Sequence, residues 1–102
     1  MILGGSRTAY YLSKMLLASG SSVTIIDKSP ERCHELEEAL PGANIILGDG
    51  AQQELLNEEG LGNMDAFVSL TGIDEENIVL SLFAKNASPK VKTITKVNHT
   101  LF

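Results

Sequence analysis

The chain has 102 residues, of which 43% are hydrophobic and 21% are charged, and its formal net charge is −5. These values are typical of one globular domain with a modest core. The acidic balance and the scattered Lys and Arg residues argue against a nucleic-acid partner, which would favour a basic patch. No apolar run approaches the ~20 residues of a membrane-spanning helix. Cys33 is the only cysteine, so no internal disulfide can form, and this favours a cytoplasmic location.

The first half of the chain predicts strands and helices in alternation. Residues 1–3 are an apolar strand stub, and residues 7–18 are expected to form a helix. Four apolar residues form one stripe on that helix: Ala9, Leu12, Met15 and Leu16. Residues 23–26 are a continuous apolar run, typical of a parallel strand that is buried on both faces. The Ser29-Pro30 pair combines a favoured N-cap with a favoured first helical residue, so a helix is expected to follow up to about residue 40.

The second half continues the alternation. In chain order, we expect a strand at 44–47, a helix at 52–59, a strand at 66–70, a helix at 75–86 and a strand at 92–97. Asp74 is expected to cap the helix that follows it. The apolar positions of that helix include Ile78, Leu82 and Phe83. The acidic runs at 35–38 and 74–76 are interpreted as solvated helix faces.

Strands alternating with helices predict an α/β fold, because parallel strands need crossover connections. We expect a Rossmann-like doubly wound parallel sheet with strand order 3-2-1-4-5. Residues 1–102 are expected to form one domain that is truncated at both ends, because the first strand is only a stub and little follows the fifth. The sequence is therefore interpreted as a piece of a longer protein.

A glycine turn and an acidic residue point to a nucleotide site. Residues 4–9 read G-G-S-R-T-A, and Asp27 follows the second expected strand. In a Rossmann domain the first glycine makes the tight turn, a small second residue admits a pyrophosphate, and a small third residue allows close packing. The acidic residue binds the ribose diol. Gly4 and Ala9 keep this pattern, whereas Ser6 departs from it.

Ligands of open α/β sheets bind beyond the carboxyl ends of the strands. Four segments are expected there: 4–9, 27–29, 48–51 and 71–74. The candidate binding residues are Gly4, Gly5, Ser6, Arg7, Ala9, Asp27, Lys28, Asp49, Gly50 and Thr71.

Several of these residues have a second interpretation. Arg7 either pairs with a phosphate or lies exposed at the start of a helix. Asp27 either binds a ribose or caps the next helix. Asp49 either meets the ligand or shapes its turn. Thr71 either bonds the nucleotide or simply ends a strand. Lys28 could accept a 2′-phosphate, but the neighbouring carboxylate argues against one.

The sequence offers a cleft without an evident catalytic set. It has no Ser/Tyr/Lys group of the short-chain dehydrogenase type and no His–acid pair for hydride transfer. His34 and His99 have no partners at metal-ligand spacing, so no metal is expected, and Cys33 is interpreted as structural. These observations favour nucleotide sensing rather than catalysis. The alternatives are the cofactor-binding fragment of an NAD-dependent oxidoreductase and a purely structural module.

Four segments together resemble one family. The domain called TrkA-N, also RCK or KTN, is similar to this chain in the turn at 4–9, the run at 23–32 that contains Asp27, the G-D-G-A turn at 48–51 and the segment A-F-V-S-L-T-G-I-D-E-E-N at 66–77. Residues 96–98 match the end of its fifth strand. The resemblance covers nearly the whole chain. Ala51 stands where the family has Thr or Ser.

The resemblance implies a cytoplasmic regulatory domain of a Trk/Ktr-type potassium transporter or channel. Such domains bind NAD(H) or ATP/ADP, form dimers or rings, and lie on the inner face of the membrane through the transporter subunit. By position, Gly4 and Ser6 would approach the phosphates, and Asp27 would bind the adenosine ribose. Asp49 and Gly50 would border the adenine, and Thr71 would line the distal side. Arg7 would contact phosphate or a neighbouring subunit.

Overall fold

The computed structural model describes residues 1–98, which form five strands and four α-helices in strict alternation. The strands are β1 (Ile2–Leu3), β2 (Thr24–Asp27), β3 (Asn44–Leu47), β4 (Ala66–Ser69) and β5 (Lys92–Thr95). The α-helices are α1 (Arg7–Ala18), α2 (Pro30–Ala39), α3 (Gln53–Glu58) and α4 (Asp74–Ala87), and a short 3-10 helix, η1 (Leu61–Asn63), follows α3. All strand pairs are parallel, and the strand order is β3-β2-β1-β4-β5, which confirms the expected doubly wound sheet.

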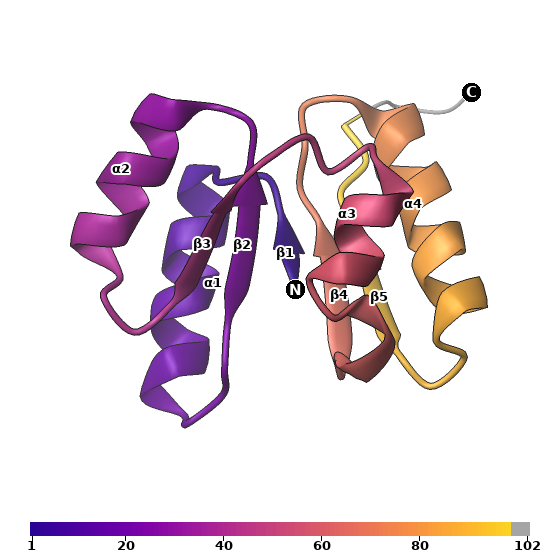
Figure 1. Cartoon of the computed structure of the whole chain (residues 1–102), viewed down its shortest axis with the longest axis horizontal. Coiled ribbons are helices and arrows are strands. Elements are labelled where there is room, and N and C mark those ends of the chain that lie inside the picture. Colours follow the sequence, from indigo (N-terminus) through magenta and orange to yellow (C-terminus); the bar gives the residue numbers. More distant parts are fainter. Residues whose placement is uncertain (99–102) are drawn as a thin grey trace.

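The first two helices, α1 and α2, cover one face of the sheet, and α3 and α4 cover the other, as Figure 1 shows. One core packs α1 and α2 against the sheet and centres on Ile2, Ile25 and Leu36. The other packs α3, η1 and α4 against the opposite face and centres on Leu3 and Phe67. The change of face falls between β1 and β4, and this is where a doubly wound sheet opens a crevice for a ligand.

The expected element boundaries are close to the observed ones. The predicted bounds of α1 and β3 are confirmed, and Ser29 caps α2 by accepting a hydrogen bond from the Arg32 amide at 3.2 Å. β5 ends at Thr95 rather than at residue 97, and η1 was not predicted. A three-residue helix has too little hydrophobic pattern to be read from sequence.

One predicted helix face was wrong in part, and a second helix buries a face that its apolar positions do not mark. Met15 was assigned to the apolar stripe of α1, yet it is 71% exposed. On α4, Ile78 and Leu82 face solvent, while the buried face consists of Asp74, Asn77, Leu80, Ser81 and Ala84. Phe83 packs against the core, and polar residues occupy much of the buried face of α4, so its apolar positions alone do not identify that face.

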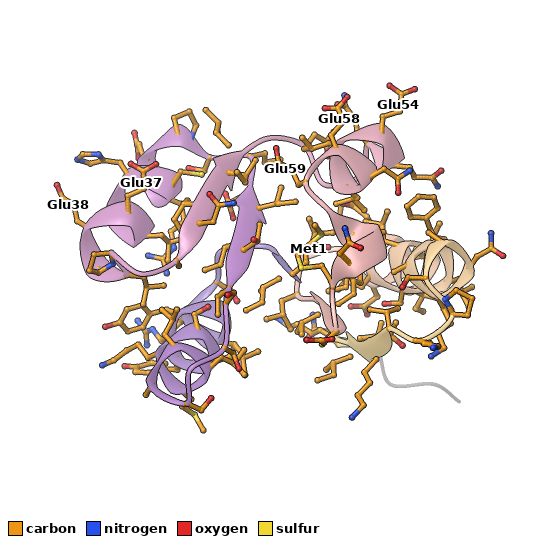
Figure 2. All side chains as sticks on the ribbon, turned by 60° about the horizontal axis from the view of Figure 1, so that its bottom comes forward. Met1, Glu37, Glu38, Glu54, Glu58 and Glu59 are labelled. Atoms are coloured by element: carbon orange, nitrogen blue, oxygen red, sulfur yellow. The ribbon has the colours of Figure 1, made fainter. Side chains whose placement is uncertain are left out.

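The role predicted for Asp74 was also wrong. Ile73 is the N-cap of α4 and makes no side-chain capping bond, and Asp74 is the first helical residue. Its carboxylate is 5% exposed and accepts a hydrogen bond from the Asn98 amide, with both oxygens 3.0 Å from the nitrogen. Asp74 therefore does not belong to a solvated acidic face, whereas Glu37 and Glu38 do project from α2 as predicted, as Figure 2 shows.

Within residues 1–98, no helix has both the length and the apolar character that a membrane crossing requires.

Candidate functional site

A cleft of about 590 Å³ opens at the carboxyl edge of the sheet. Its residues come from the carboxyl ends of β1 and β2, from the turns after β1, β2, β3 and β4, and from the first turn of α2 and α4. The lining consists of Leu3, Gly4, Gly5, Ser6, Ile26, Asp27, Lys28, Ser29, Arg32, Gly48, Asp49, Gly50, Leu70, Thr71, Gly72, Ile73 and Glu76. The size and concave shape suit a small-molecule ligand.

The turns after β1 and β2, residues 4–6 and 27–29, form what we call the proximal wall. Gly4 has a φ of +97°, and a Cβ there would lie 3.0 Å from the Leu70 carbonyl group. Glycine is therefore required at this position both for the backbone conformation and for the close approach to β4. The expected role of the first glycine in the tight turn is confirmed.

Asp27 ties the two turns of the proximal wall together. One carboxylate oxygen accepts a hydrogen bond from the Gly5 amide at 2.7 Å, and the other accepts one from the Ser29 amide at 2.8 Å. Asp27 does not cap α2, because Ser29 does. A carboxylate has about four lone-pair positions, so each oxygen keeps capacity for a further donor such as a ligand hydroxyl.

Arg32, which the sequence interpretation did not select, joins the proximal wall from α2. Its Nε donates to the Gly5 carbonyl oxygen, and its Nη1 lies 3.1 Å from a carboxylate oxygen of Glu35. The side chain thereby places a positive charge at the edge of the glycine turn. A lone arginine in a polar helix start gives no sequence signal for this contact, which joins residues 27 positions apart.

Ser6 has a structural role that explains its departure from glycine. It is the N-cap of α1, and its hydroxyl oxygen accepts a hydrogen bond from the Ala9 amide at 3.2 Å. Serine before a helix is a favoured cap, so this role was available from the sequence. The residue keeps its place in the cleft lining while its hydroxyl is directed to the helix.

The turn after β3 forms the floor of the cleft beside β1. A Cβ at Gly50 would lie only 1.7 Å from the Leu3 side chain, so no larger residue fits without displacing a core leucine. Asp49 accepts a hydrogen bond from the Ala51 amide at 2.9 Å and also lines the cleft. Both interpretations of Asp49, as a turn residue and as a cleft residue, are thus compatible with its position.

The loop after β4, residues 71–73, together with Glu76 forms what we call the distal wall. Thr71 lines the cleft, but its hydroxyl already donates to the buried side-chain oxygen of Asn77 at 2.6 Å. The Thr71 amide donates to the same oxygen at 3.0 Å. Thr71 is therefore more than a strand end, because it fixes this loop to α4.

Two of the ten predicted binding residues are not part of the cleft lining. Ala9 is fully buried in the core beneath α1, which fits the close packing expected of the third small residue. Arg7 is exposed and lines a second groove with Tyr10, Tyr11 and residues of α2. The remaining eight predicted residues meet at the cleft.

The charges around the cleft are mixed. The acidic residues Asp27, Asp49 and Glu76 and the basic residues Lys28 and Arg32 all line it. Beneath it, burial and then the negative charges of Asp27 and Glu37 raise the pKa of the Cys33 thiol, which lies 3.4 Å from the Asp27 carbonyl oxygen. Cys33 is therefore a neutral, buried packing residue at neutral pH, in keeping with its structural interpretation.

The metal prediction concerned two histidines. His34 lies on the exposed face of α2, 3.1 Å from Glu38, and His99 lies outside the described residues. Among residues 1–98, no three His, Cys, Asp or Glu side chains are grouped so that they could hold a metal ion.

The sheet order, the helix layers and the cleft at the switch point define a Rossmann-like domain. The profile of the TrkA-N domain family matches residues 1–101. The chain belongs to the TrkA-N domain family.

Individual relatives agree with this assignment. The chain is 36% identical over 97 residues to a Trk system potassium uptake protein TrkA homolog of Pyrococcus abyssi, covering 95% of this chain and 42% of that protein. It is 38% identical over 90 residues to the Trk system potassium uptake protein TrkA of Vibrio alginolyticus, covering 88% of this chain and 19% of that protein. The chain thus spans less than half of either relative.

A solved structure supports the fold. The TrkA-N domain of the inner membrane protein ybaL from Escherichia coli superimposes with a TM-score of 0.79 at 24% sequence identity, covering 90% of this chain and 67% of that chain.

Proposed function

We propose that this domain binds an adenine nucleotide, NAD(H) or ATP/ADP, and uses its occupancy to regulate potassium transport. The observation that carries the proposal is Asp27, whose carboxylate stands at the cleft between two backbone amides and keeps lone pairs for a ribose diol. The phosphates would lie against the turn of the proximal wall at the start of α1, where free amides and the helix dipole favour an anion. The family assignment supports nucleotide binding in general.

The transport role rests on the relatives. Those from Pyrococcus abyssi and Vibrio alginolyticus are named as Trk system potassium uptake proteins. We propose that the domain acts in the cytoplasm as one module of a larger, non-catalytic regulatory protein. It would reach the inner face of the membrane through a potassium transporter or channel subunit and would assemble as a dimer or ring. Sedimentation velocity with and without nucleotide tests the oligomer.

A thermal-shift titration with NADH, NAD⁺, ATP and ADP tests nucleotide binding directly. A ligand present at a hundred times its dissociation constant should stabilise the fold by about 2.7 kcal/mol. For a domain of this size that corresponds to a rise in Tm on the order of 10 °C. If none of the four nucleotides raises the Tm at millimolar concentration, the proposal is wrong and the domain is a structural module.

A further inference from the structure

The side chain of Asn77 joins the distal wall of the cleft to the segment that leaves the sheet. Asn77 is fully buried on the first turns of α4. Its oxygen accepts hydrogen bonds from the Ser69 hydroxyl at 2.9 Å and from the amide and hydroxyl of Thr71. Its nitrogen donates to the carbonyl oxygens of Thr71 at 3.0 Å and Lys96 at 3.1 Å. One amide group thus connects β4, the cleft loop and the end of β5.

The segment 96–98 depends on these contacts. Sheet pairing in β5 ends at Thr95. Beyond it, the Lys96 amide donates to the Ser69 carbonyl oxygen at 3.0 Å. The Lys96 carbonyl accepts from Asn77, and the Asn98 amide donates to Asp74. One backbone bond to β4 and side chains from the first turn of α4 therefore hold this segment together.

The same helical turn faces the cleft. Glu76 lines the cleft and lies between Asp74 and Asn77, and the Thr71 hydroxyl on the distal wall contacts the Asn77 oxygen. A buried side-chain amide with all these bonds is costly to disturb in part, since the loss of either donated bond leaves a buried N–H group unsatisfied. The wall and the segment 96–98 are consequently expected to open together rather than separately.

We propose that Asn77 is a positioning residue that makes the distal wall and the segment 96–98 one mechanical unit. The part of this inference that concerns the ligand rests on the proposed function. A nucleotide that orders Thr71 would then also order Lys96 and Asn98. Binding at the cleft would in this way change the conformational order of the segment that follows β5. The physical basis is the shared set of hydrogen bonds. A ligand shifts an equilibrium between two conformations only if it interacts differently with them, and here both the wall and the segment change between the same two conformations.

The first arm of the test needs no ligand and measures amide hydrogen exchange by NMR in the wild-type chain and in variants. Thr71→Val removes the hydroxyl contact with Asn77 and touches neither Lys96 nor Asn98. We expect the Lys96 and Asn98 amides to exchange roughly three- to tenfold faster in this variant, the scale of one lost hydrogen bond. Asn77→Asp keeps the acceptor oxygen but removes both donated bonds, and should have a larger effect on the same amides.

Ser81→Ala is the matched control. It removes a partly buried contact of 2.6 Å between the Ser81 and Thr95 hydroxyls of α4 and β5, one turn after Asn77, and leaves the cleft wall intact. It should change exchange at Lys96 and Asn98 only as much as it changes global stability, which the amides of β2 report. If Thr71→Val alters exchange at residues 71–73 alone, the inference is overturned, even if Asn77→Asp does not fold.

The second arm adds NADH to the wild-type chain. We expect the Thr71, Lys96 and Asn98 amides to slow together. Slowing at Gly5 and Ser29 without any change at Lys96 and Asn98 would overturn the coupling while leaving nucleotide binding intact. No change at any cleft amide with NADH, NAD⁺, ATP or ADP would refute the proposed function, and the ligand-free arm would still decide the role of Asn77.

Discussion

The two walls of the cleft are built in different ways. The proximal wall is made of backbone: glycines at 4 and 5 bring the main chain close, and one carboxylate binds two amides. The distal wall is held by a buried side-chain amide that contacts three elements. The shape of the proximal wall therefore depends on available space and backbone conformation, and the shape of the distal wall depends on a hydrogen-bond network. Substitutions should affect the two walls for different reasons.

The largest effect is expected at Gly4, where the proximal wall touches β4. Gly4→Ala should lower the free energy of unfolding by about 2–4 kcal/mol, because it adds backbone strain and crowding against the Leu70 carbonyl group. Gly20→Ala is the control, since Gly20 also has a positive φ of +89° but nothing within 4 Å of the added Cβ. It should cost only about 1–2 kcal/mol. Equal losses in urea unfolding would show that space does not limit this wall.

Asp27→Ala should come next. It removes the proposed ribose partner and leaves two backbone amides without their acceptor. Nucleotide affinity should fall by about 1–3 kcal/mol, the scale of hydrogen bonds to a charged group, as measured by calorimetry. Asp49→Ala removes a carboxylate with a single backbone contact and should cost less. A greater loss of nucleotide affinity in Asp49→Ala than in Asp27→Ala would indicate that the ribose binds at the turn after β3.

Ser6 separates helix capping from access to the cleft. Ser6→Ala should lower stability by about 1 kcal/mol through loss of the N-cap, whereas Ser6→Gly should cost only a few tenths. Ser6→Gly should also bind nucleotide more tightly than wild type, because the backbone can approach a phosphate more closely. Equal affinity in Ser6→Gly and wild type would show that the Ser6 side chain does not restrict the approach of a phosphate.

The smallest effect concerns Cys33, which lies directly beneath Asp27. Its folded-state pKa is raised, so the unfolded chain loses the thiol proton first. Stability from this group is therefore fully present below the unfolded pKa of about 8.5 and declines as the pH rises through the folded value. Urea unfolding of wild type and Cys33→Ala between pH 7 and 10 should show this decline in wild type alone. Parallel pH profiles for the two chains would contradict the assignment.

Much of the proximal wall could be predicted from the sequence, because its chemistry is local. The glycine requirement at Gly4, the acid at Asp27 and the Ser29 cap each follow from a turn or a helix start of a few residues. The distal wall could be recognised only as a family pattern. Its mechanism depends on Lys96, which lies 19 residues from Asn77 in the chain.

The sequence by itself determined the alternation of strands and helices, the parallel sheet and the edge at which a ligand would bind, since periodicity and turn residues act over short distances. Only the tertiary structure decided which face of α4 is buried, because polar residues such as Asn77 occupy it in place of apolar ones. The tertiary structure also showed that Arg32 contacts Gly5 and that Arg7 lines another groove instead of the cleft. Contacts between distant segments are set by packing, which local pattern does not encode.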